Sequence, residues 1–203
     1  PATTFHYLEG ESRVKLLTSM ETNVHEIGHG YFRYVLSDYL AKSGKQRNDD
    51  YAELLLYLNS YEQFFVSVPN NILFPSRELA KVIPAQLNTF RYNIYIEGNS
   101  STQSDGVVGL LNEFFAYYIG SKFCYDMLSA YKSAEGNNAE GFLRWVQHTQ
   151  SSMSAYYEFD YFIKEYLLYM KQYYPTNYQT LATSVGFKEA YTKVNTAYQK
   201  LTV

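Results

Sequence analysis

Residues 25–29 read His25-Glu26-Ile27-Gly28-His29, which is the pattern HExxH. On a helix, residues four positions apart share a face, so both imidazoles would point to the same side. Two neutral imidazole nitrogens at this spacing can bind one Zn²⁺ at about 2.0–2.1 Å each. Glu26 directly follows the first histidine, where it can take a proton from a water molecule that the metal activates. The pentapeptide therefore predicts a zinc site on a helix, with Glu26 as the general base.

The flanking sequence predicts the helix that such a site requires. Upstream, Thr18-Ser19-Met20-Glu21 has the S/T-x-x-E form of a capping box, which starts a helix. Downstream, apolar residues continue for several turns to Leu40 and Lys42, and Ser43-Gly44 then marks a stop. Both histidines are therefore expected in the middle of this helix, where the backbone is stiffest and the ligand pair is best fixed.

A catalytic zinc ion normally takes three protein ligands, so one more ligand must come from elsewhere in the chain. The extended pattern HExxHxxGxxH is excluded, because Phe32 and Val35 stand where it needs Gly and His. A Glu, Asp or His on a second helix remains, and Glu113 is the strongest candidate. It is the acidic residue in an otherwise apolar helical stretch from Leu110 to Tyr118, where a buried, unpaired carboxylate would be costly. The alternative is that Glu113 lies at an exposed edge or pairs with a Lys or Arg.

A resemblance supports this ligand set. His25-Glu26-Ile27-Gly28-His29 followed by Asn112-Glu113-Phe114-Phe115-Ala116 resembles the HExxH…NExxA arrangement of the gluzincin metallopeptidases. The two segments, about ten residues in all, are closest to the branch that includes the lethal-factor-like toxin proteases. The resemblance implies a zincin-like metallopeptidase domain in which His25, His29 and Glu113 bind zinc and Glu26 is the general base.

The chain departs from the gluzincin pattern at three points. Residues 30–112 place 83 residues between the second histidine and Glu113, more than the short spacer of most such enzymes. Thermolysin-like members carry Asp four residues after the ligand Glu, where this chain has Tyr117. The sheet that aligns the substrate in the family is barely present upstream, unless residues 3–9 supply a strand. We therefore expect a helical insertion at about residues 45–105 that packs beside the metal helix and forms one wall of the cleft.

The apolar pattern along the chain predicts a mainly α fold with at most one or two short strands. In the insertion, helices are expected at 49–66 and at 76–91, with a kink at Pro84. Residues 94–98 are expected to be extended and residues 99–106 to form a polar, mobile loop. Further helices are expected at 107–131, 139–150, 152–173 and 187–201. No linker or repeat divides the sequence, so residues 1–203 are predicted to form a single domain.

The composition excludes several classes of function. A formal net charge of −3 and a pI of about 5.8 give no electrostatic basis for binding nucleic acid or an anionic membrane. No stretch approaches the roughly 18 apolar residues of a membrane span. Cys124 is the one cysteine, so it cannot form an internal disulfide and is interpreted as a buried packing residue. The start at Pro1, without an initiator Met or a signal peptide, is interpreted as that of a mature, secreted or cell-envelope product.

Three functions remain open at this point. The first is a zinc peptidase that acts on a peptide or protein substrate. The second is a non-catalytic binding or interaction module on a zincin scaffold, with zinc bound but the cleft incomplete. The third is a helical structural domain without metal.

A peptidase also needs a hydrogen-bond donor for the oxyanion, commonly Tyr or His in this superfamily. The candidates are Tyr92, Tyr95, Tyr117, Tyr118 and His148, whereas His6 and His148 are not expected to be metal ligands.

Overall fold

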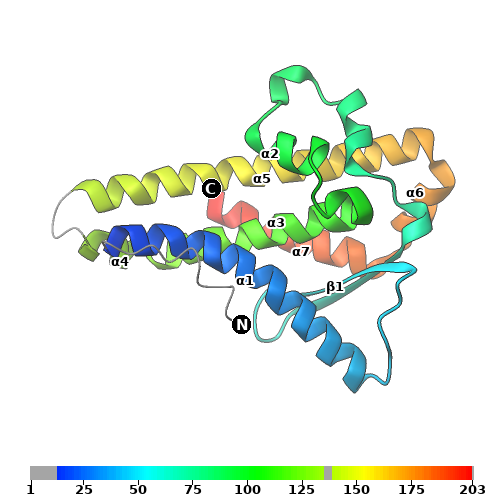
Figure 1. The fold of residues 1–203 in the computed structure, drawn as a ribbon, viewed down its shortest axis with the longest axis horizontal. Helices are drawn as coiled ribbons and strands as arrows, with labels where there is room; N and C mark the ends of the chain where they lie inside the picture. Colours follow the sequence, from blue (N-terminus) through cyan, green and yellow to red (C-terminus); the bar gives the residue numbers. More distant parts are fainter. Residues whose placement is uncertain (1–12, 135–138, 203) are drawn as a thin grey trace.

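The computed structural model describes residues 13–134 and 139–202, and this part of the chain is mainly α-helical (Figure 1). The mainly α prediction is therefore confirmed, and the strand expected at residues 3–9, with His6, lies outside the described residues. None of the described helices is both long enough and apolar enough to cross a lipid bilayer. In chain order the elements are α1 (Arg13–Lys42), β1 (Tyr51–Tyr57), β2 (Gln63–Pro69), the 3₁₀ turns η2 (Asn70–Ile72), η3 (Ser76–Lys81) and η4 (Ala85–Leu87), α2 (Phe90–Tyr92), the π-helical turn η5 (Asn93–Glu97), α3 (Thr102–Asp126), α4 (Leu128–Ala134), α5 (Ala139–Tyr173), α6 (Pro175–Ala182) and α7 (Val185–Thr202).

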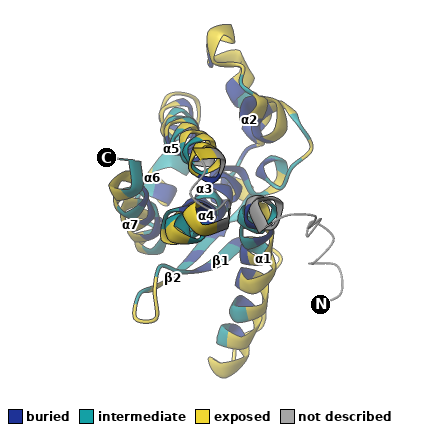
Figure 2. Cartoon of the chain, turned by 90° about the vertical axis from the view of Figure 1, so that its left-hand side faces the viewer, coloured by how far each residue is buried: buried dark blue, intermediate teal, exposed yellow. Residues whose placement is uncertain are grey.

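Helix α3 runs through the middle of the molecule, and α1, α5 and α7 all pack against it (Figure 1). Its apolar side chains point in every direction, and Leu110, Leu111, Phe114, Phe115 and Cys124 are all fully buried. A helix that is apolar on every side belongs in the core. Figure 2 shows buried residues gathered along α3, whereas the C-terminal part of α1 is largely exposed. Glu113, a polar residue of α3, is accordingly buried as well.

The helix predicted at residues 49–66 is wrong, because this segment forms a β-hairpin. Strand β1 pairs antiparallel with β2, and the register places Tyr51 opposite Pro69 and Tyr57 opposite Gln63. Strand β1 contacts α1 and α3, and β2 contacts α7. The hairpin therefore follows the HExxH helix in sequence and packs beneath α1 and α3 (Figure 1).

Two local features favour the hairpin over a helix. The side-chain oxygen of Asn59 accepts hydrogen bonds from the backbone N–H groups of Tyr61 and Glu62, at 2.8 and 3.0 Å. Such an Asx turn interrupts the apolar run and reverses the chain. Along β2, Val66 and Val68 are fully buried while the residue between them is partly exposed, which is the period-two pattern of a half-buried strand.

The helix predicted at residues 76–91 is also wrong. The 3₁₀ turns η3 and η4 occupy most of this segment, and Pro84 precedes η4. Proline lacks the N–H that an α-helix would need there, so the backbone cannot continue helically through it. A new helix begins only after Thr89, whose hydroxyl accepts a hydrogen bond from the N–H of Tyr92 at 3.1 Å. The insertion at about 45–105 is therefore a hairpin followed by short turns, not a pair of helices.

Several predicted boundaries differ from the structure as well. The stretch 94–98, expected to be extended, lies mostly in the π-helical turn η5. Helix α3 has a break at Gly106 (φ 52°, ψ −127°), so the predicted helix from residue 107 matches its longer part, and only residues 102–105 are helical within the predicted loop 99–106. There, Thr102 and Gln103 bond the carbonyls of Tyr95 and Ile96 at 2.5 and 2.9 Å. These bonds tie the polar segment to η5. The helices predicted at 139–150 and 152–173 are one continuous helix, α5, and α6 was not predicted.

Tyr166 of α5 holds the linker between η2 and η3 in place. Its hydroxyl accepts a hydrogen bond from the N–H of Phe74 and donates one to the carbonyl of the same residue, both at 2.7 Å. The two rings are stacked with their centroids 3.9 Å apart. Because both side chains are buried, no water can replace these bonds.

We expect Tyr166→Phe to lower the free energy of unfolding by about 2–4 kcal/mol, since it leaves a buried N–H and a buried carbonyl without partners. Chemical denaturation of the two proteins measures this difference. Tyr157→Phe is the matched control, because Tyr157 lies on the same helix with 58% of its surface exposed. The control should change stability by less than about 0.5 kcal/mol. Equal stability of all three proteins would contradict the assignment.

Candidate metal centre

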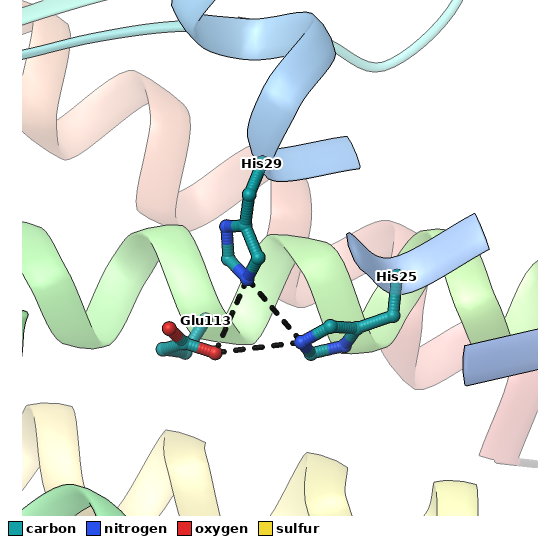
Figure 3. Close-up of side chains that lie close together, drawn as sticks. All are labelled: His25, His29 and Glu113. Atoms are coloured by element: carbon teal, nitrogen blue, oxygen red, sulfur yellow. Dashed lines mark hydrogen bonds and ion pairs between the residues drawn. The ribbon is translucent and has the colours of Figure 1, made fainter. Parts of the chain in front are cut away.

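The structure brings the three predicted ligands together between α1 and α3. Figure 3 shows His25 and His29 reaching from α1 toward Glu113 on α3. The Nε2 atoms of the two histidines are 3.3 Å apart, and the Oε2 atom of Glu113 lies 3.5 Å from His25 and 3.4 Å from His29. Among the described residues (13–134 and 139–202), one group of His, Cys, Asp or Glu side chains has its ligand atoms close enough together to hold a metal ion. That group is His25, His29 and Glu113.

The spacing of the three atoms fits the donor geometry of zinc. Ligand atoms at about 2.0–2.1 Å around a tetrahedral ion are about 3.3–3.4 Å from one another. The observed separations of 3.3, 3.4 and 3.5 Å agree with three corners of such a tetrahedron. Two imidazoles and one carboxylate are also a donor set that zinc accepts in catalytic sites. These three residues could therefore hold a zinc ion without a large rearrangement.

The close approach of α1 and α3 explains why the ligands can converge. A Cβ atom on Gly28 would lie 2.4 Å from the Cδ1 atom of Ile119, so a larger residue would push the side chain of Ile119 away. On the facing helix, a Cβ atom on Gly120 would lie 3.4 Å from the carbonyl oxygen of Glu21. A glycine inside a helix costs about 1 kcal/mol relative to alanine. Gly28 therefore allows close contact between α1 and α3, the two helices that carry the candidate ligands.

The electrostatics of the triad favour an ionised carboxylate. Burial by itself would raise the pKa of Glu113, but its hydrogen bonds with His25 and His29 outweigh burial and lower the pKa to about 2. Burial would lower the pKa of His29, but the hydrogen bond and the charge of Glu113 outweigh this and raise it. Glu113 is buried and pairs with the two histidines. The alternatives, that it lies at an exposed edge or pairs with a Lys or Arg, are therefore wrong.

A cleft of about 380 Å³ opens beside the triad. Glu26 is exposed on α1 and lines this cleft together with its neighbour His25. The opposite wall comes from α2 and η5, so the predicted insertion does contribute a wall, although not as a helix at 76–91. The residues that this wall and the adjoining helices contribute are Phe90, Arg91, Ile94, Tyr95, Tyr117 and Ser151.

The structure separates the five candidates for the oxyanion donor. Tyr95 and Tyr117 both line the cleft, and their hydroxyl oxygens are 3.3 Å apart. The Tyr92 hydroxyl instead donates to Glu97 at 3.2 Å, and Tyr118 packs in the core against Tyr198. The side chain of His148 lies outside what the structure describes. Burial raises the pKa of both Tyr95 and Tyr117, so each keeps its proton at neutral pH and can donate a hydrogen bond.

Arg91 is the residue of the site that the sequence did not reveal. It is 5% exposed, and its guanidinium bonds Glu158 at 3.0 Å and the carbonyl of Ser151 at 3.1 Å, both on α5. The guanidinium also lies 4.9 Å from the centre of the Tyr117 ring. A single Arg in an aromatic stretch was the only local signal, and its partners are about 60 residues away in the sequence.

Comparison with known proteins identified no relative: no protein-family model, no curated protein and no solved structure matches the chain. The geometry of the site therefore carries the functional argument.

Proposed function

We propose that the protein is a zinc-dependent peptidase in which His25, His29 and Glu113 bind the metal and Glu26 is the general base. One observation carries the proposal. Three ligand atoms from two helices lie at the separations that a tetrahedral zinc site needs, at the edge of a cleft that Glu26 also lines. The gluzincin resemblance of the two segments that supply these residues supports the same assignment.

Each residue at the cleft then has a chemical task. Bound zinc supplies a Lewis acid that polarises the scissile carbonyl and lowers the pKa of water. Glu26 takes a proton from the attacking water and returns it to the leaving amine. The protonated hydroxyls of Tyr95 and Tyr117 donate hydrogen bonds to the oxygen on which negative charge develops. Such donors act most strongly when their positions are fixed before the reaction.

The size and the apolar rim of the cleft are compatible with a peptide substrate. Its volume of about 380 Å³ lies in the range of sites that hold small ligands or a few side chains. The rim carries apolar groups, because Phe90 and Ile94 are 58% and 40% exposed there. A peptide can place apolar side chains against this rim while its backbone passes Glu26.

Removal of the metal is the experiment that tests the proposal. We expect the zinc-loaded protein to cleave members of a mixed peptide library, detected by mass spectrometry. Dialysis against a zinc chelator should reduce the rate at least about 100-fold, and one equivalent of zinc should restore it. Cleavage that continues in a sample shown to contain no zinc would contradict the proposal. A fully zinc-loaded protein that cleaves nothing would favour the binding module instead.

A further inference from the structure

Tyr117 contacts one of the metal ligands directly. It lies one helical turn after Glu113 on α3, and its ring meets the ring of His25 edge-on, with centroids 4.5 Å apart and planes at 75°. Tyr117 is only half-buried, because it lines the cleft, whereas its neighbour Tyr118 lies in the core. The position is therefore part of the site and not only part of the packing.

Tyr117 is itself held on several sides. The guanidinium of Arg91 lies 4.9 Å from its ring centroid, which is within the range of a cation–π contact. The ring of Phe159 on α5 lies 5.1 Å away, and the Tyr95 hydroxyl is 3.3 Å from the Tyr117 hydroxyl. These contacts leave the ring little freedom to turn away from His25.

Arg91 is fixed in turn by α5. Its guanidinium bonds Glu158 at 3.0 Å and both the carbonyl and the hydroxyl oxygen of Ser151 at 3.1 Å. Glu158 also accepts a hydrogen bond from the hydroxyl of Thr89, the residue that caps α2. A buried charge persists only where it is paired and hydrogen-bonded, as this one is. A continuous series of contacts therefore runs from α5 through Arg91 and Tyr117 to His25.

We propose that Tyr117 and Arg91 are positioning residues for the zinc ligand His25. The ring of Tyr117 fixes the plane of the His25 imidazole so that Nε2 faces His29 and Glu113, and Arg91 fixes the ring of Tyr117. Neighbours that orient a ligand imidazole typically change metal affinity about 10–100-fold when they are removed. An aromatic ring orients the imidazole without adding a negative charge, so the metal keeps more of its own charge than it would beside a carboxylate. This inference rests on the proposed zinc centre.

The test compares Tyr117→Leu with the matched control Tyr118→Leu. Both variants remove a tyrosine ring from adjacent positions of α3, but only Tyr117 touches His25. We expect zinc affinity, measured by competition with a chromophoric chelator, to fall at least about 10-fold in Tyr117→Leu. The visible absorption bands of the cobalt-substituted protein should shift in the same variant. Tyr118→Leu should keep the wild-type affinity and spectrum, although its thermal unfolding temperature falls.

Two more variants test the ring of Tyr117 and its contact with Arg91 separately. Tyr117→Phe keeps the ring, so zinc affinity should stay within about 3-fold of wild type. Arg91→Lys keeps the charge but loses the planar fork, and should weaken zinc binding about 3–10-fold. In the Tyr117→Leu background, Arg91→Lys should cause no further loss of zinc affinity, because Arg91 acts on His25 through the ring of Tyr117.

The outcomes distinguish this inference from the proposed function. Wild-type protein that binds zinc, with Tyr117→Leu showing the same affinity and cobalt spectrum, overturns the positioning role alone. Additive effects of Arg91→Lys and Tyr117→Leu overturn the assignment of Arg91 to the same series of contacts. Wild-type protein that binds no zinc overturns the metal centre and this inference together.

Discussion

Replacing Glu26 with Gln is expected to abolish peptide cleavage while zinc remains bound and the fold is unchanged. Gln has nearly the same shape as Glu but cannot accept a proton from water near neutral pH. Loss of a general base typically costs about 10²–10⁴-fold in rate, and more where the same group also protonates the leaving amine. Glu26 is exposed on α1, so the change also leaves no buried group unpaired. Peptide-library cleavage and zinc content would be measured on the same samples.

Asp38→Asn is the matched control for this variant. Asp38 is an exposed acid on the same helix, far from the cleft, where it bonds Lys42 at 2.7 Å. The control removes one negative charge from α1, as Glu26→Gln does, but should retain full activity. Equal cleavage by wild type and Glu26→Gln would refute the mechanism.

Replacing Glu113 with Ala is expected to weaken zinc binding by at least an order of magnitude, because it removes one of three protein ligands. Cleavage should fall in parallel at limiting zinc. The measurement is competition with a chelator of known affinity, made on wild type and variant at the same pH. Asp126→Asn is the control, since Asp126 is an exposed acid at the C-terminal end of the same helix. Unchanged zinc content in Glu113→Ala would show that the third ligand is another residue.

The meeting of His25, His29 and Glu113 could be predicted because each part has a strong local signal. The i, i+4 spacing of His25 and His29 fixes their common face once the helix is formed. Glu113 stands out because its apolar neighbours require burial, and a buried carboxylate requires a partner. Both helices could be predicted because their apolar stretches are much longer than a typical strand, and length separates a helix from a strand where periodicity does not.

The hairpin could not be predicted in the same way. Residues 49–66 place apolar side chains at spacings that fit a helix as well as a strand, and short apolar runs are ambiguous by periodicity. Whether this segment forms a helix or a hairpin depends on the Asx turn at Asn59 and on packing against α1, α3 and α7. Tertiary contacts thus override the local preference, as is common for strands.

The insertion was expected to form a wall of the cleft, but its secondary structure could not be predicted because long-range contacts hold it. Arg91 takes its position from Glu158 and Ser151, and the preceding turns from Tyr166, all of them on α5. No pattern within residues 76–98 indicates these partners. Likewise, the sequence could not single out Tyr95 and Tyr117 among the 23 tyrosines as candidate oxyanion donors, because only the packing of η5 against α3 brings them together.

The zinc content and coordination of the wild-type protein decide whether His25, His29 and Glu113 form a metal centre. The protein would be incubated with one equivalent of zinc, dialysed against metal-free buffer and measured by elemental analysis and zinc X-ray absorption. We expect about one zinc per chain, with nitrogen and oxygen ligands at about 2.0–2.2 Å, two of them imidazoles. Zinc that dialyses away from folded protein, or a sulfur ligand at about 2.3 Å, would contradict it.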